Sequence, residues 1–201
     1  MDRRWKRADR TAATLQVSAG YALLASLSVA ISLLLRDGLP WVHPAPWLPM
    51  GFAAGVLSSA ILGLAFALGL IVMTRIAVAR YCWARHLHGE LRPVARDLSL
   101  GQILLLAGLS SLGEELLFRG LLTPLLGVPL SALLFGLAHQ MKGPSRWVWV
   151  VWAMAVGAGL GGIFALTGSL VGPLLSHAVV NAVNLSYLRD HDPEEPERRA
   201  A

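Results

Sequence analysis

The sequence is poor in cysteine and in charge, and each shortage excludes a class of protein. Cys82 is the only cysteine among 201 residues, so an intrachain disulfide and a cysteine metal cluster are both excluded. Charged residues make up only 14% of the chain while hydrophobic residues make up 55%, which excludes an ordinary soluble domain. The His-Glu-x-x-His pattern of many zinc enzymes is also absent. A helical membrane protein is the natural interpretation of this composition.

Long apolar runs dominate the chain, and they predict an all-α fold: a polytopic membrane helical bundle of about six transmembrane helices. The first run is too long for the core of a cleavable signal peptide, so we expect it to remain in the protein. The expected spans are about 15–35, 50–79, 98–126, 128–140, 147–166 and 169–188. Pro124 is expected to kink or end the third of them.

Composition divides the chain into three predicted parts. Residues 1–97 hold an N-terminal cytoplasmic segment, two transmembrane helices and a basic connector. Residues 98–188 form a four-helix core, and residues 189–201 form a charged, disordered cytoplasmic tail. Four glycines between 157 and 162 are expected to let the fifth helix approach its neighbours closely.

Lysine and arginine gather in alternate loops, and this asymmetry predicts the orientation of the protein in its membrane. Basic clusters precede the first span and follow the second, fourth and sixth, whereas the other loops hold almost none. We therefore expect a multi-pass protein of the bacterial inner (plasma) membrane with both termini in the cytoplasm. The net charge of +5 is then an orientation signal and gives no support for nucleic-acid binding.

Three polar motifs interrupt these apolar spans. An ionisable group in the hydrocarbon region costs at least ~2.5–3.5 kcal/mol on insertion scales, so each motif is a functional-site hypothesis by default. The motifs are Glu114-Glu115-x-x-x-Arg119, Phe135-x-x-x-His139 and His177-x-x-x-Asn181.

Helical spacing separates the two glutamates. Glu115 and Arg119 lie four residues apart, so they share a helix face and can neutralise each other when buried. Glu114 points about 100° away and has to find its partner on another helix. The candidate partners are His139, His177 and Asn181.

Such a set of side chains suits peptide-bond hydrolysis. The reaction needs a base that activates water, donors for the oxyanion, and a group that protonates the leaving amine. Glu114, His139 and His177 also form a plausible zinc ligand set with an open position. Both possibilities stay open at this point: a zinc cofactor, or none.

Other functions fit the same motifs. A buried Glu–Arg pair can be purely structural, and a histidine or asparagine between helices can serve only as a hydrogen-bonding group. A non-proteolytic immunity or scaffold protein would keep the fold without the chemistry. A small proton-coupled transporter would use the ionisable residues as a relay, although no inverted repeat supports it.

In their order along the chain, the three motifs resemble those of the CAAX protease and bacteriocin-processing (CPBP) family of intramembrane endopeptidases. The resemblance covers about residues 98–188. It implies a glutamate-type or metal-dependent peptidase that acts on a membrane-associated protein or peptide within the lipid bilayer.

The resemblance also implies a role for each residue of the motifs. Glu114 would be the general base, assisted by His139, while His177 and Asn181 would stabilise the oxyanion. Glu115 and Arg119 would support these groups, and Phe135 would shape the pocket. A count of ~1.5 Å per residue places Glu114 ~24 Å from the cytoplasmic start of its helix, which favours a site toward the outer side and an exported substrate.

Overall fold

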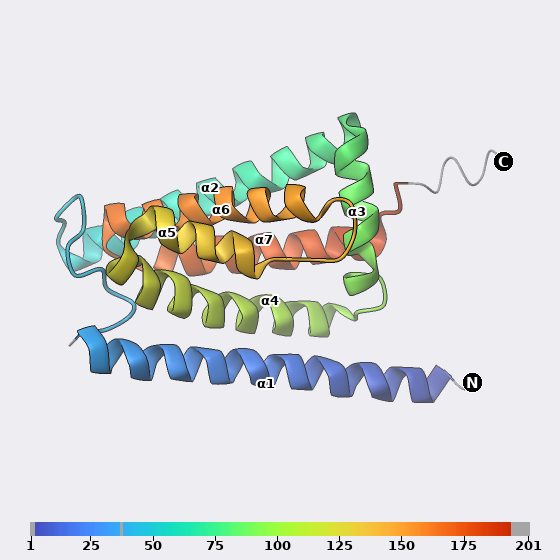
Figure 1. The fold of residues 1–201 in the computed structure, drawn as a ribbon, viewed down its shortest axis with the longest axis horizontal. Helices are drawn as coiled ribbons and strands as arrows, with labels where there is room; N and C mark the ends of the chain where they lie inside the picture. The colour runs from blue at the N-terminus through green and yellow to red at the C-terminus, as the bar shows by residue number, and fades with distance from the viewer. Residues whose placement is uncertain (1–2, 37, 194–201) are drawn as a thin grey trace.

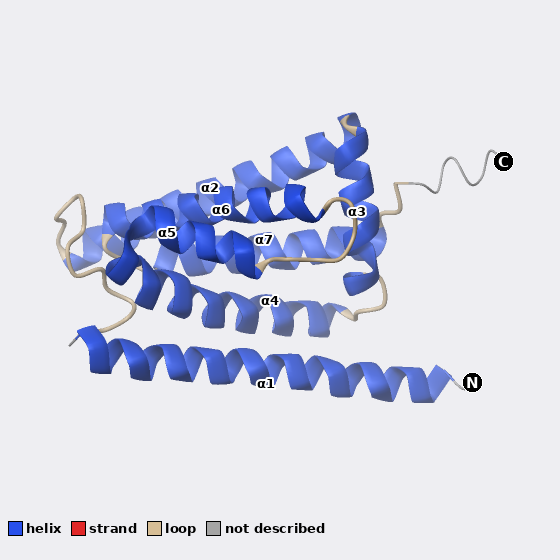
Figure 2. Ribbon diagram, in the orientation of Figure 1, coloured by secondary structure: helices blue, strands red, loops and turns tan. Residues whose placement is uncertain are grey.

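The computed structural model describes residues 3–36 and 38–193, with side chains from Thr11 onward, and its regular elements in this part of the chain are helices. The predicted all-α bundle is confirmed (Figure 2). The elements are α1 (Arg3–Arg36), α2 (Phe52–Arg80), α3 (Cys82–Ala95), α4 (Leu100–Glu115), the π-helix η1 (Leu116–Leu122), α5 (Thr123–Ala138), α6 (Arg146–Thr167) and α7 (Val171–Asp190).

The long helices lie side by side along one axis, and α3 crosses the bundle at the end where the chain begins (Figure 1). Helix α1 forms one edge and packs on α4 and η1. Helix α5 packs on α6, and α2 packs on α7, which also contacts α4. These contacts bring the three motif-bearing segments into the middle of one bundle.

Four segments of the described chain are long and apolar enough to cross a membrane, fewer than the six predicted spans. Helix α5 has only 16 residues, and α7 carries several polar side chains. Large apolar side chains such as Leu34 (82% exposed) and Phe52 (80% exposed) lie on the outside of the bundle, as expected for contact with lipid. The four segments are Thr11–Arg36, Phe52–Arg80, Leu100–Ala138 and Arg146–Thr167.

The segment Leu100–Ala138 is continuous in composition but turns back on itself. Gly127 has φ +79° and ψ 164°, a conformation that favours glycine, and it separates two helical runs within α5. This break falls where the sequence predicted it, between 98–126 and 128–140. Pro124 does not end the helix. Because proline has no N–H to offer the Gly120 carbonyl, that oxygen accepts a hydrogen bond from Arg36 of α1 instead.

The π-helix η1 was not predicted. In its wider turn the carbonyl of Phe118 accepts from the backbone N–H of Thr123, five residues on, and the hydroxyls of Thr123 and Ser131 each donate to the same oxygen at 2.8 Å. The same turn carries Arg119, whose side chain is 1% exposed. An irregular turn is thus stabilised by hydroxyl groups at the place where the motifs meet.

Close helix approach depends on glycine at a few positions. A Cβ at Gly157 of α6 would lie 3.0 Å from the ring of Phe135, so the absence of a side chain lets α5 pack against α6. Gly161 faces Val128 in the same way, whereas Gly159 faces α2 and a Cβ at Gly162 would meet no described atom within 4 Å. The predicted close approach of the glycine-rich helix is therefore confirmed for three of its four glycines.

The basic connector predicted between the second and third spans folds into the helix α3. His88 and Leu87 are buried against the bundle, while Arg80 and Trp83 are exposed. The His88 ring donates from Nε2 to the carbonyl of His191 at 2.9 Å. The start of the predicted tail is therefore packed on α3, and the rest of that tail, 194–201, lies outside the described residues.

Candidate active site

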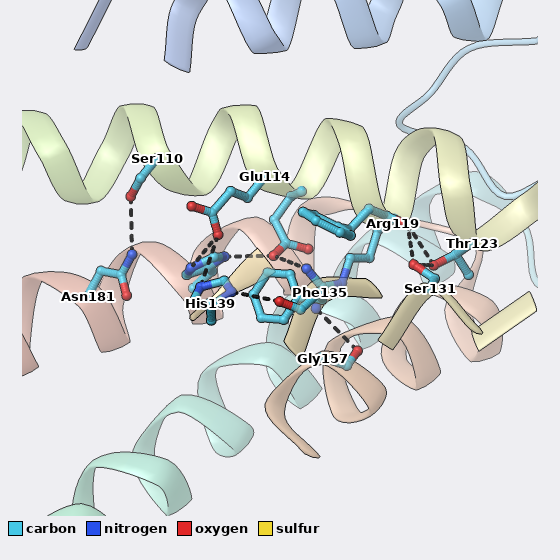
Figure 3. A network of polar contacts seen from close by, with 12 residues as sticks. Ser110, Glu114, Arg119, Thr123, Ser131, Phe135, His139, Gly157 and Asn181 are labelled. Atoms are coloured by element: carbon cyan, nitrogen blue, oxygen red, sulfur yellow. Dashed lines mark hydrogen bonds and ion pairs between the residues drawn. The ribbon is translucent and has the colours of Figure 1, made fainter. Parts of the chain in front are cut away.

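Glu115 and Arg119 form the buried pair that their spacing predicts. Arg119 Nη1 lies 2.9 Å from Glu115 Oε1, and the two side chains are 1% and 0% exposed. Arg119 Nη2 donates to the carbonyl of Gly157 at 3.2 Å, and its guanidinium lies 4.3 Å from the centre of the Phe135 ring. The arginine therefore ties η1 to both α5 and α6 (Figure 3).

Glu115 has a second partner that helical spacing did not predict. Its Oε1 atom also lies 2.7 Å from Nδ1 of His177, on α7. A carboxylate can only accept, so Nδ1 of His177 carries the hydrogen, and Nε2 of the neutral ring bears a lone pair. One buried carboxylate thus neutralises an arginine and fixes the tautomer of a histidine.

Glu114 faces both histidines. Its Oε2 atom lies 3.6 Å from Nε2 of His139 and 3.8 Å from Nε2 of His177. Among the described side chains Oε2 has no hydrogen-bond partner, although it is buried. His139 donates from Nδ1 to the carbonyl of Phe135 at 2.8 Å, so its Nε2 also bears a lone pair when the ring is neutral. Oε2 of Glu114 and the two Nε2 atoms therefore converge without a hydrogen bond between them.

Asn181 lies in the same cavity but does not join this convergence directly. Its Nδ2 donates to Oγ of Ser110 at 3.1 Å, one helical turn before Glu114 on α4. Its side-chain oxygen is left available to the cavity. Ser110 is thus part of the site. In the sequence, the only indication of this was its position four residues before Glu114, on the same helix face.

Phe135 forms the apolar floor of the site. Its ring is 2% exposed, packs edge-on against Phe118 and lies 4.3 Å from the centre of the His139 ring. It also contacts His177 edge-on at 6.0 Å. The ring holds both imidazoles in place while offering them no hydrogen bond.

A cavity of about 390 Å³ adjoins these groups. Glu114 and both histidines line it, and it extends to α3, where His88 and Trp83 line it. Trp149 and Trp152 of α6 add aromatic walls. The cavity extends toward the end of the bundle that bears α3.

The donor types also fit the predicted zinc ligand set, with two free Nε2 atoms and one carboxylate oxygen. As arranged, however, the described residues contain no group of three or more His, Cys, Asp or Glu side chains placed to hold a metal ion. We therefore derive no chemical step through a metal.

Comparison with known proteins gives a family for the part of the chain that holds all three motifs. Residues 96–183 match the family model described as type II CAAX prenyl endopeptidase Rce1-like. The match confirms the resemblance seen in the motifs, and the matched residues, here called the Rce1-like segment, leave out α1, α2 and α3.

A relative of uncharacterized function shares a longer stretch. The chain is 27% identical over 123 residues to the uncharacterized protein YpbD of Bacillus subtilis, which is 60% of this chain. The aligned stretch spans 64% of the length of YpbD. No solved structure matches the chain.

Proposed function

We propose that this protein is an intramembrane endopeptidase that hydrolyses a peptide bond of a membrane-associated protein or peptide. One observation carries the proposal: Oε2 of Glu114 and the Nε2 atoms of His139 and His177 converge, without a hydrogen bond between them, at a cavity inside an apolar bundle. The family name of the Rce1-like segment, which describes endopeptidases, supports the same reaction class.

Glu114 is the general base of the proposed reaction. A water molecule hydrogen-bonded to both Oε2 of Glu114 and Nε2 of His139 from the cavity side loses a proton to Glu114 as its oxygen attacks the scissile carbonyl. His139 Nε2 can accept the second hydrogen of that water, which orients the attacking lone pair. The Nδ1 bond of His139 to Phe135 keeps Nε2 turned toward the water.

His177 and Asn181 stabilise the oxyanion that forms. His177 can donate from Nε2 to the oxyanion when its ring carries both hydrogens, and its Nδ1 hydrogen bond to Glu115 orients the ring. Asn181 can turn its Nδ2 from Ser110 toward the developing charge. Collapse of the tetrahedral intermediate breaks the C–N bond, and the proton held by Glu114 passes to the leaving amine.

The shape of the cavity favours a substrate that arrives from the α3 end. The lysine and arginine distribution supports placing that end, with both termini, at the cytoplasmic face of the plasma membrane. The apolar and tryptophan-lined walls suit the apolar end of a membrane-anchored chain. The proposed substrate is therefore a protein or peptide cleaved close to its membrane segment on the cytoplasmic side.

Zinc is a second proposal for the same side chains. Glu114, His139 and His177 would hold the ion, which would polarise the attacking water when bound. Elemental analysis tests this without an activity assay. Stoichiometric zinc in the purified protein that the Glu114→Ala variant lacks supports the proposal, and an equal zinc content in the wild type and the variant contradicts it.

The experiment for the main proposal compares membranes of cells that make the wild-type protein or Glu114→Ala. A membrane-anchored protein that accumulates uncleaved only with the variant is the expected substrate, and its peptide should be cleaved by wild-type protein in proteoliposomes. Cleavage that survives Glu114→Ala would overturn the mechanism. If Glu114→Gln retained the cellular phenotype without any cleavage, the immunity or scaffold function would be favoured. Cleavage by the protein in detergent, where no ion gradient exists, would argue against a transporter.

A further inference from the structure

A fixed arginine lies where α2 packs on α7, at the end of the bundle where both helices meet α3 (Figure 1). Arg75 of α2 donates from Nη1 to Oδ1 of Asn184 at 3.1 Å and from Nη2 to the carbonyl of Val183 at 3.3 Å. Its guanidinium carbon lies 3.5 Å from the centre of the Tyr187 ring. We infer that Arg75 binds the phosphate of an acidic lipid headgroup. Such a site would act whether or not the protein is a peptidase.

The charge of Arg75 is not matched by a carboxylate in the described part of the chain. Among the residues that the structure describes, no aspartate or glutamate forms an ion pair with it, whereas Arg92 of α3 lies 3.3 Å from Asp192. A guanidinium has five N–H donors, and the bonds to Asn184 and Val183 occupy two of them. The side chain therefore keeps a full positive charge and three donors for an anion.

Three neutral groups hold this cation in one place. The Tyr187 ring lies under the guanidinium, and the Asn184 side chain and the Val183 carbonyl fix the direction of its two terminal nitrogens. A planar guanidinium offers parallel N–H donors that match two oxygens of a phosphate. Because the fork is already oriented in the folded protein, a phosphate can bind without first ordering a long side chain.

The depth of Arg75 along α2 suits a lipid phosphate. The 29 residues of α2 span about 43 Å, whereas the hydrocarbon core of a bilayer is ~30 Å thick. Arg75 precedes the last residue of the helix, Arg80, by roughly 7 Å, so it lies near the level where hydrocarbon gives way to headgroups. Val72, one turn earlier on the same face, and Val183 of α7 are both exposed. They supply an apolar surface for the acyl chains below the headgroup.

The position of Arg75 favours a lipid over a ligand of the cavity. Asn184 and Tyr187 line the cavity that also reaches Glu114, whereas Arg75 is not one of the described residues that line it. Its bond to the Val183 carbonyl is exposed on the outside of the bundle. The two α7 side chains therefore lie between the guanidinium and the cavity, and a ligand of Arg75 approaches from the surrounding membrane.

The first test measures which lipids stay bound to the purified protein. Phosphatidylglycerol and phosphatidylcholine are added in equal amounts in detergent, and native mass spectrometry follows both. The wild type should retain phosphatidylglycerol preferentially, and Arg75→Gln should bind it about tenfold more weakly, because a charge-assisted contact is lost. Arg80→Gln, the same change of charge at the exposed end of α2, should bind like the wild type. Equal affinities for the two variants, or equal retention of the two lipids by the wild type, would overturn the inference.

The second test separates lost binding from lost folding. Tyr187→Phe keeps a ring under the guanidinium, whereas Tyr187→Leu removes the ring and leaves the charge of Arg75 in place. Phosphatidylglycerol should raise the thermal unfolding midpoint of the wild type and Tyr187→Phe more than that of Tyr187→Leu and Arg75→Gln, each measured against its own lipid-free value. Equal shifts in all four proteins would contradict a site at Arg75. Inorganic phosphate should not reproduce the shift, and an Arg75-dependent shift with phosphate alone would show that the site takes a free anion and that the lipid assignment is wrong.

Discussion

His177 Nδ1 and Glu115 Oε1 lie 2.7 Å apart, and this hydrogen bond joins the last helix to the buried Glu115–Arg119 pair. The same oxygen thus stabilises the fold at Arg119 and orients a ring that faces Glu114. Stability and chemistry are coupled through one carboxylate, so changes at Glu115 should affect both.

Glu115→Gln should destabilise the protein strongly. The change keeps the shape of the side chain but leaves Arg119 buried without a counter-charge, which costs ~3–5 kcal/mol when a buried pair is broken on one side. The thermal unfolding midpoint in detergent measures the loss. The double variant Glu115→Gln/Arg119→Met should recover part of it, because no unpaired charge remains. Equal midpoints for wild type and Glu115→Gln would contradict this account of the pair.

His139→Ala should impair cleavage without a comparable loss of stability. The ring is partly exposed, with 22% of its side chain accessible, and its bond to Phe135 is local to α5. Loss of the group that orients the attacking water should lower kcat ~10²–10⁴-fold. Peptide cleavage in proteoliposomes and the unfolding midpoint measure the two effects, with His86→Ala on the exposed side of α3 as control. Normal cleavage by His139→Ala would remove this residue from the mechanism.

The sequence allowed the bundle and the meeting of its motifs to be predicted, because both follow from local patterns. Apolar runs located the helices, the glycine at 127 located a turn, and spacing of four predicted the Glu115–Arg119 contact. The bond between His177 and Glu115 was not predictable in this way, because it joins residues 62 positions apart.

Two further features were not predicted from the sequence, for different physical reasons. Helix α3 has a weakly apolar and strongly basic sequence, so its charge suggested a connector, while its amphipathic face becomes evident only when it is packed across the bundle. Tyr21 lies in a span of ordinary lipid-facing composition, and only the approach of α1 to Gly113 places it at the lining of the cavity.

The stability of the α3 end should depend on pH through His88. Burial lowers the pKa of this imidazole below its usual value of 6.5, and the charges of Arg92 and Arg75 act in the same direction, against the hydrogen bond to His191. The folded state therefore binds a proton less readily than the unfolded state. Stability is fully present above about pH 6.5 and is lost as the pH falls from there toward the lowered folded pKa.

Amide hydrogen exchange of α3 between pH 7.5 and 5 measures this effect. After correction for the intrinsic exchange rate, protection of α3 should fall with pH in the wild type. His88→Gln keeps a donor for the His191 carbonyl but cannot be protonated in this range, so its protection should fall less steeply. Parallel slopes for the two proteins would show that His88 does not govern this end of the bundle.

The packing of α2 on α7 should fail when one methyl group is added at Gly63. A Cβ at this position would overlap the backbone of Gly172, and the neighbouring Ser59 already bonds that segment through Gly172 N at 2.9 Å and Ser169 O at 2.7 Å. Neither backbone can yield without separating the helices, so Gly63→Ala should cost ~1–3 kcal/mol by overpacking. Gly69→Ala on the same helix is the matched control, because its Cβ would meet no described atom within 4 Å and alanine favours the helix. The unfolding midpoint in detergent should fall for Gly63→Ala and stay level or rise for Gly69→Ala, and the same value for both variants would show that α2 and α7 do not touch at this point.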